Sequence, residues 1–300
     1  MSTTPGPITD ADIPGYLHTL DLPGLADIHV HFLPQRMMES VWAYFDQAEQ
    51  HYGRPWPIHY REDEDSRLDR LRSFGLAAVP ALSYAHKPGM ATWLNTWSRD
   101  FARRVPEAVH CATFYPEPGA ADYVREAIAD GARLFKLHIQ VGGFAPDDPL
   151  LDEVWSVLER SRTPVVVHAG SAPIRGQFTG PGLVRRVLEE HPELVLVIAH
   201  MGMPEFDAFA DLILDYPSVH LDTTMVGTDF TNQFAPMPRD YIDRLPGLRD
   251  RVILGSDFPN IPYPYAHQLE SLARLDLGDD WMRSVLWENG AGLLGPFTGT

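Results

Sequence analysis

Two histidines one residue apart stand in the apolar segment Leu25–Phe32, which reads LADIHVHF. In an extended strand alternate side chains share a face about 7 Å apart, so His29 and His31 are expected to point to the same side. Two imidazoles on one face of a strand can bind a single metal ion. Taken alone, the segment is equally typical of an apolar strand that merely contains two histidines.

Three further apolar runs end in residues that can bind a metal, namely His168, His200 and Asp257. Histidine nitrogens and a carboxylate oxygen are a usual ligand set for zinc and related divalent ions. We expect His29, His31, His168 and Asp257 to hold one metal ion and to leave a position for water. A divalent ion can lower the pKa of bound water to about 7, which would supply a nucleophile at neutral pH.

His200 is expected beside that water or the substrate, as a proton shuttle or an electrostatic stabiliser, or as a group that supports the ligands. Each candidate has a simpler explanation, since a single histidine at a strand end is usually hydrogen-bonded and Asp257 could cap a following helix. The candidates stand together at the ends of several strands, however, and this arrangement favours a metal centre.

The elements that must position these residues are apolar runs that alternate with helical patterns. Near-continuous apolar strands separated by helices indicate parallel strands covered on both faces. The predicted strands occupy residues 25–32, 76–82, 109–115, 134–139, 164–168, 194–200, 219–223 and 252–257. Eight such units predict an α/β fold of the (β/α)₈ TIM-barrel type, with an open doubly wound sheet as the alternative. The barrel is favoured because it gathers polar residues from the carboxyl end of every strand into one mouth.

The predicted organisation is an N-terminal arm over residues 1–24 and one barrel domain over residues 25–300. A helix is expected over Gln35–Gln50, and a lid-like insertion around residues 46–66 follows the first strand. Long loops at this place in a barrel often cover a site.

The composition limits the function classes. A formal net charge of −17 argues against nucleic acid and anionic membranes as partners. The single cysteine, Cys111, fits a reducing compartment, and the N-terminus lacks the pattern of a signal peptide, so a cytoplasmic location is expected. A homodimer is expected on general grounds only.

The motifs carry a family resemblance that covers nearly the whole chain from Leu25. The order His-x-His, His, His, Asp on strands 1, 5, 6 and 8 resembles the amidohydrolase superfamily. The details DIHVH, HAG, HMG and GSDFP are similar to its amidohydrolase-related branch. That branch includes aminocarboxymuconate-semialdehyde decarboxylase, resorcylate-type decarboxylases and lactone hydrolases. The resemblance implies that His29, His31, His168 and Asp257 are ligands, that His200 is catalytic, and that Asp257 also accepts a proton from the water.

Binuclear members of the superfamily use a carboxylated lysine at the end of strand 4, where this chain has Lys136. Lys136 stands two residues before His138 and is expected to lie too deep, as a buried lysine paired with a carboxylate. One metal ion is therefore expected, with Zn²⁺ as the first choice, although Mn²⁺, Fe²⁺ and Co²⁺ accept the same ligands.

The substrate contacts are predicted from position alone. His138 and His86 stand near strand ends, and His138 is expected to touch either the ligands or the substrate. Arg175, on a loop past His168, could pair with a substrate carboxylate, or it could be a solvated loop residue. Trp42 could wall a pocket or pack within the insertion.

The favoured hypothesis is a metal-dependent hydrolase acting on a small amide, lactone or ester. The first alternative is a metal-dependent non-oxidative decarboxylase of a small aromatic or unsaturated acid, because the same ligands serve both reactions. The second alternative is an inactive barrel that acts as a binding protein. The complete ligand set argues against it, since unused clustered histidines would cost stability.

Overall fold

The computed structural model describes residues 3–295, and the chain divides into two compact units. The central unit is residues 80–222, and the terminal unit combines residues 3–79 with residues 223–295. None of the described helices is long and apolar enough to cross a membrane.

The central unit is built on parallel strands in sequential order. The register pairs Cys111 with Leu134, Phe135 with Val165, Val165 with Leu196, and Leu196 with Val219. The strands that pair in this order are β3 (Cys111–Thr113), β4 (Leu134–His138), β5 (Val165–His168), β6 (Leu196–Ile198) and β7 (Val219–Asp222). Strand β2 (Ala108–Val109) forms a separate two-stranded sheet with β1 (Val79–Pro80), which ends at the first residue of this unit. This order is the one expected from strands that alternate with helices.

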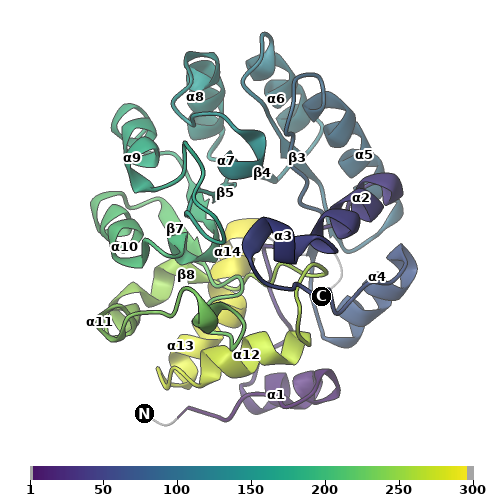
Figure 1. Cartoon of the computed structure of the whole chain (residues 1–300), viewed down its shortest axis with the longest axis vertical. Helices are drawn as coiled ribbons and strands as arrows, with labels where there is room; N and C mark the ends of the chain where they lie inside the picture. Colours follow the sequence, from purple (N-terminus) through teal and green to yellow (C-terminus); the bar gives the residue numbers. More distant parts are fainter. Residues whose placement is uncertain (1–2, 296–300) are drawn as a thin grey trace. The chain divides into compact units, whose positions relative to one another are not determined.

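Helices follow the strands and lie outside them (Figure 1). They are α5 (Ala91–Arg104), α6 (Ala120–Ala129), α7 (Ile139–Gly142), α8 (Asp152–Ser161), α9 (Pro181–Glu190) and α10 (Phe206–Asp215). Their apolar residues recur at helical spacing, as Val154, Val157 and Leu158 do in α8, and these side chains are buried. The strands, buried throughout their apolar length, form the core of this unit.

The first predicted strand, over residues 25–32, is an extended segment held by separate bridges. Leu25 bridges Leu76, and Val30 bridges Phe258, both in parallel. The Ile28 amide donates to the Leu254 carbonyl at 3.0 Å. Strand β8 is only Val252–Ile253, so the chain from residue 254 to residue 258 continues beside residues 28–31 without regular ladder geometry. The bridges of both segments are parallel, as the barrel prediction requires.

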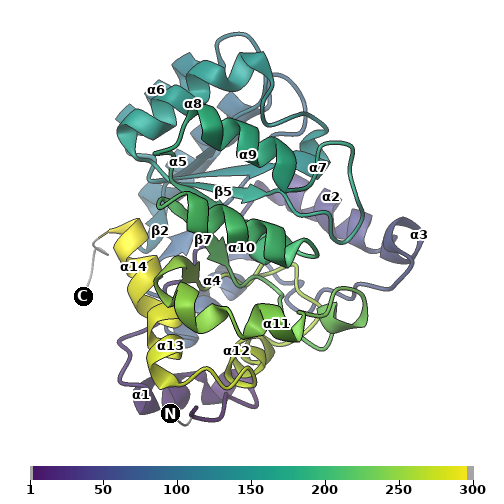
Figure 2. The same cartoon turned by 90° about the vertical axis from the view of Figure 1, so that its left-hand side faces the viewer.

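The terminal unit carries the remaining helices, and Figure 2 shows α1 beside α12. They are α1 (Ile13–Thr19), α2 (Gln35–Phe45), α3 (Ala48–Tyr52), α4 (Glu64–Ser73), α11 (Arg239–Ile242), α12 (Tyr265–Ala273), α13 (Asp279–Arg283) and α14 (Asn289–Leu294). The N-terminal segment expected as an arm contains α1 and is anchored by Asp10, which accepts hydrogen bonds from the Tyr60 hydroxyl at 2.5 Å and the Ala266 amide at 2.9 Å.

The helix expected over Gln35–Gln50 is two helices, α2 and α3, separated near Asp46. The insertion that follows is tied to the loop after Asp257. The Trp56 indole donates to the Asn260 carbonyl at 2.8 Å, and the His59 amide donates to the Ile261 carbonyl at 2.8 Å. The segment that follows the first histidine pair therefore packs on the segment that follows the aspartate.

Candidate metal centre

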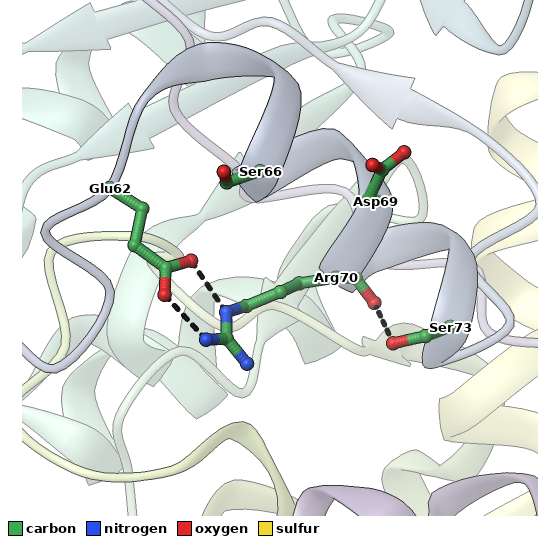
Figure 3. Close-up of a pocket in the computed structure, with 5 residues that line it drawn as sticks. All are labelled: Glu62, Ser66, Asp69, Arg70 and Ser73. Carbon is green, nitrogen blue, oxygen red and sulfur yellow. Dashed lines mark hydrogen bonds and ion pairs between the residues drawn. The ribbon is translucent and has the colours of Figure 1, made fainter.

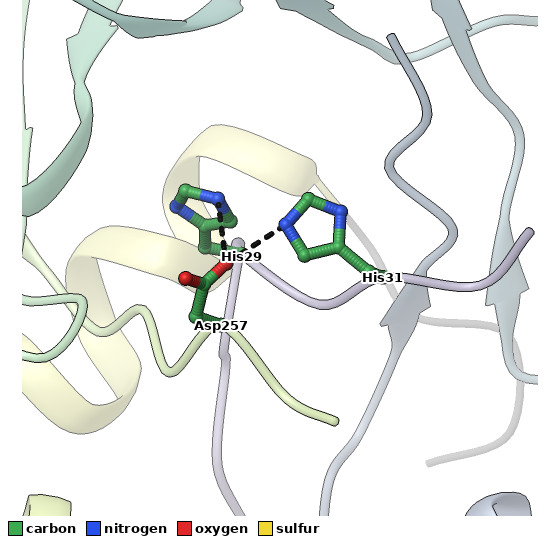
Figure 4. A group of neighbouring side chains, drawn as sticks. All are labelled: His29, His31 and Asp257. Atoms are coloured by element: carbon green, nitrogen blue, oxygen red, sulfur yellow. Dashed lines mark hydrogen bonds and ion pairs between the residues drawn. The ribbon is translucent and has the colours of Figure 1, made fainter. Parts of the chain in front are cut away.

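His29, His31 and Asp257 form one cluster in the terminal unit (Figure 4). The Nε2 atom of His31 lies 2.8 Å from Asp257 Oδ1, and the Nε2 atom of His29 lies 3.5 Å from the same oxygen. The two rings have centroids 5.1 Å apart, and both histidines are buried. The first two predicted ligands and the fourth are thus brought together across more than 200 residues of sequence.

The backbone explains why these side chains meet. The Asp257 amide donates to the His29 carbonyl at 2.9 Å, and the His31 amide donates to the Phe258 carbonyl at 2.7 Å. Asp257 itself adopts a left-handed conformation with φ 72°, which aspartate tolerates better than most residues. The next helix, α12, begins only at Tyr265 with Pro264 as its N-cap, so Asp257 does not cap it.

The orientation of the His29 ring is set by a residue that sequence reasoning missed. The Nδ1 atom of His29 lies 3.0 Å from the hydroxyl of Thr224, which is fully buried. When Nδ1 carries the proton and donates to that hydroxyl, Nε2 keeps its lone pair on the side of Asp257. The only sequence signal for Thr224 was its position just after the predicted strand over residues 219–223.

A second missed residue is Asp27, whose carboxylate is completely buried beneath the histidine pair. It accepts hydrogen bonds from the His29 amide at 2.9 Å and from the Tyr265 hydroxyl at 2.7 Å. Burial, and then the neighbouring Asp27 charge, raise the pKa of Tyr265 well above its ordinary value, so the phenol stays a proton donor. Through these two hydrogen bonds Asp27 links the backbone of His29 to the first residue of helix α12.

The central unit holds a second group of histidines. His138 and His168, in register at the carboxyl ends of β4 and β5, have rings stacked 4.0 Å apart at 12°. The His200 ring lies 4.7 Å from that of His168 in an edge contact. The Nε2 atom of His168 lies 3.1 Å from the Ala172 carbonyl oxygen. The structure thus brings together the predicted ligand His168, the predicted catalytic His200, and His138.

His200 was expected at the end of a strand, but it lies in the 3₁₀ turn Ala199–Gly202 after β6. Its backbone is left-handed, with φ 55°, and its amide donates to the buried Asp222 carboxylate at 2.8 Å. Strain of this kind persists only where the surroundings enforce it and is common at functional sites. Asp222, at the end of β7, is a third residue that sequence reasoning missed.

Gly170, in the HAG motif, explains how the turns after β5 and β6 pack together. A Cβ atom at this position would lie 2.4 Å from the Met203 carbonyl oxygen. Any larger residue would therefore push the two turns apart, and these turns carry the segments next to His168 and His200.

The other predicted site residues have different surroundings. Trp42 is half-buried, and its indole donates to the Asn260 side chain at 3.2 Å. The side chains of His86 and Arg175 are exposed. Partial desolvation, and then the nearby charge of Lys87, lower the pKa of His86. Lys136 is buried in β4, and its carbonyl accepts from the Thr113 hydroxyl at 2.8 Å.

A surface pocket along α4 has no histidine in its lining (Figure 3). It is lined by Glu62, Ser66, Asp69, Arg70 and Ser73. Glu62 and Arg70 form a two-point ion pair, with Arg70 Nε 2.5 Å from the carboxylate. Glu62 and Arg70 therefore neutralise each other, and Asp69 pairs with Arg72 outside the pocket lining.

The donor set of the terminal unit fits a divalent metal ion. The ligand atoms of His29, His31 and Asp257 all lie within 4.8 Å of one another. Two imidazoles and a carboxylate are a combination that zinc, manganese and iron accept. The third predicted histidine ligand, His168, belongs to the central unit.

A family model described as amidohydrolase matches residues 26–295. An uncharacterized TIM-barrel protein from Bordetella bronchiseptica has a TM-score of 0.72 and 18% identity, and the match covers 89% of this chain and 98% of that one. No curated protein matches the sequence.

Two further solved structures match at a TM-score of 0.59. One is a probable 2-pyrone-4,6-dicarboxylic acid hydrolase from Acinetobacter baumannii, at 14% identity over 90% of this chain and 98% of that one. The other is a 5-carboxyvanillate decarboxylase from Novosphingobium aromaticivorans complexed with manganese, at 15% identity over 90% of this chain and 96% of that one. At these identities the likeness concerns the fold.

The parallel strands, the covering helices and the clustered donors define a metal-dependent enzyme on an α/β barrel of the TIM type. The chain belongs to the amidohydrolase family. The predicted fold and the predicted superfamily are therefore confirmed.

Proposed function

We propose that this protein is a hydrolase that uses one divalent metal ion, with Zn²⁺ as the first choice, to hydrolyse a small amide, lactone or ester. The observation that carries the proposal is the His29, His31 and Asp257 cluster in a chain of the amidohydrolase family. In the proposal His168 completes the ligand set, and His200 is the catalytic histidine.

The chain's own residues have separate tasks in this proposal. His29, His31 and Asp257 hold the ion, which supplies Lewis-acid activation of water and of the substrate carbonyl. Thr224 keeps the Nε2 atom of His29 available by engaging Nδ1 at 3.0 Å.

His200 takes or returns protons at the substrate and offsets the charge that develops on it. Its position is held through the hydrogen bond from its amide to Asp222. This backbone contact fixes the place from which the imidazole ring acts.

The surroundings of Arg175 bear on the substrate class. A side chain that anchors a substrate carboxylate is usually preorganised by its neighbours. Arg175 is exposed on the loop after β5, which favours a neutral carbonyl compound over a carboxylic acid. Decarboxylation is the second candidate, because one of the solved structures with the same fold is a decarboxylase.

The test is a panel of small amides, lactones, esters and aromatic acids with metal-loaded and metal-stripped full-length protein. We expect metal-dependent formation of acid from a neutral substrate, with no release of carbon dioxide. The exposed residue His18 provides a matched control, since His18→Ala should keep the activity that His31→Ala loses. Carbon dioxide release in place of acid formation would replace the hydrolase by the decarboxylase.

A further inference from the structure

A second group of metal-binding side chains lies in the central unit, at the adjoining ends of α8 and α9. It consists of Asp152, Glu190 and His191, whose ligand atoms lie within 4.8 Å of one another. Helices α8 and α9 run side by side in both views of the chain (Figures 1 and 2). We call this group, together with Glu159, the α8–α9 cluster.

The imidazole at its centre is buried and has an unused nitrogen. His191 is only 6% exposed, and its Nε2 atom has no hydrogen-bond partner among residues 3–295. That atom points toward the Asp152 carboxylate, with Nε2 3.4 Å from Oδ1. This separation is too long for a good hydrogen bond. It matches the spacing of about 3.4 Å between two donors that each lie about 2.0–2.1 Å from a tetrahedral zinc ion.

The other ring nitrogen of His191 faces a carboxylate, as in many metal sites. Its Nδ1 atom lies 3.6 Å from Glu159 Oε2, while Oε1 of the same carboxylate accepts from the Glu193 amide at 2.9 Å. A carboxylate beside one nitrogen of a ligating histidine favours the ring orientation that turns the other nitrogen toward the metal. At 3.6 Å Glu159 does this through its charge and not through a hydrogen bond. Asp152 and Glu159 are two turns apart, so they lie on one face of α8.

The charge of the cluster is not balanced by arginine or lysine among the residues that the structure describes. Nearby acids are paired in that way, as Glu153 is with Arg125 and Glu193 is with Arg162. The ion pairs of Asp152 and Glu159, in contrast, are with His191 only. The carboxyl end of α9, which is also negative, reaches the cluster at Glu190. A cation would complete this arrangement.

We propose that the α8–α9 cluster binds a divalent cation of the zinc class through His191 Nε2, Asp152 and Glu190, with Glu159 as the residue that positions the imidazole. The site is separate from the His29, His31 and Asp257 cluster and does not depend on the proposed reaction. Its ligands come from two helices, so bound metal joins the end of α9 to the start of α8.

The test compares zinc binding by metal-stripped full-length protein and its variants, using equilibrium dialysis with elemental analysis. His191→Ala should bind one zinc equivalent fewer than the wild type. Asp152→Asn, which changes an exposed side chain without changing its size, should bind the same ion at least about tenfold more weakly. Glu159→Gln should weaken binding by about 10- to 100-fold while leaving the three ligands in place.

The matched control is Glu189→Gln, since Glu189 is an exposed carboxylate in the same last turn of α9 but outside the cluster. It should bind zinc as the wild type does. Zinc should also raise the melting temperature of the wild type more than that of Asp152→Asn, which reports on the site even if His191→Ala folds poorly. Equal stoichiometry and affinity in wild type, His191→Ala and Asp152→Asn would overturn the proposal, as would an equal loss in Glu189→Gln.

Discussion

The two clusters of metal-binding side chains make a useful comparison because each places a histidine Nε2 near an aspartate oxygen, at 3.5 Å for His29 and Asp257 and at 3.4 Å for His191 and Asp152. They differ in how the carboxylate is held. The Asp257 side chain is 18% exposed, and the backbone amide of Asp257 is hydrogen-bonded to the carbonyl of His29. The Asp152 side chain, in contrast, is 65% exposed.

The same types of donor atom can therefore form metal sites of different affinity. Buried donors on bonded backbone segments lose little freedom when they bind an ion, and water screens them poorly. Exposed carboxylates at helix ends must be ordered on binding. We therefore expect the terminal-unit cluster to be the tight site that supports chemistry and the α8–α9 cluster to be the weaker one.

The largest effect is expected from His31→Ala, which removes a ligand of the tight site. Metal affinity and turnover should each fall by more than about 100-fold, since even partners outside the ligand shell cost up to that much. Elemental analysis and rate measurements on the same preparation would check this. Unchanged metal content in His31→Ala would show that this cluster does not hold the ion.

Thr224→Val keeps the shape of the side chain but removes the hydroxyl that engages His29 Nδ1. Metal affinity should fall by about 10- to 100-fold, because the ring is no longer fixed in one tautomer. Competition with a coloured chelator would measure the change, and the exposed residue Thr92 offers the control Thr92→Val. An affinity equal to that of the wild type would show that the contact is not a determinant of binding.

Graded addition of a chelator to zinc-loaded protein would test the comparison directly. The ion of the α8–α9 cluster should leave first, with an affinity at least about tenfold weaker, because its carboxylates are exposed. His191→Ala should lack this early phase, and His31→Ala should lack the late one. The reverse assignment of the two phases would refute the ranking.

Tyr265→Phe should destabilise the fold by about 1–3 kcal/mol, because it removes the hydroxyl that donates to Oδ2 of the buried Asp27 carboxylate. The pKa of Tyr265 is raised in the folded state from an ordinary value of 10.0, so its contribution is present below that pH and is lost as the pH rises through the folded value. Urea unfolding should therefore show a gap between wild type and variant at neutral pH that narrows above about pH 10.

The exposed residue Tyr44 provides the control, since Tyr44→Phe should leave the unfolding free energy within about 0.5 kcal/mol of the wild type. If Tyr265→Phe were as stable as the wild type at neutral pH, the hydrogen bond to Asp27 would contribute nothing net.

The smallest effect is expected from Arg175→Ala. Its guanidinium is exposed, so its removal should change kcat/KM for a neutral substrate by less than about threefold. Steady-state kinetics would measure this. A loss of more than about tenfold, confined to KM, would instead indicate a carboxylate-bearing substrate.

Much of the fold and part of the site could be predicted because their signals are local. The alternation of apolar runs and helical patterns indicated the barrel, and the spacing of His29 and His31 indicated a shared face. The GSDFP motif marked Asp257, which the structure places against the histidine pair. Element ends were less predictable, since β8 is shorter than expected and the predicted helix over residues 35–50 is divided in two.

Residues whose roles depend on contacts with distant parts of the chain could not be identified from the sequence. Thr224, Asp27 and Asp222 occur in ordinary strand-end patterns, and only their partners reveal what they do. His191 follows a helix that gave no hint of Asp152, which lies 39 positions earlier in the sequence.

The chemically capable side chains can be listed from the sequence, and its periodic pattern shows which of them face the same way, because strand and helix geometry depends on neighbours a few residues apart. Which of those side chains lie together, and which partners orient them, is visible only in the folded chain. Such contacts join segments far apart in the chain, and their positions follow from packing that no local pattern encodes.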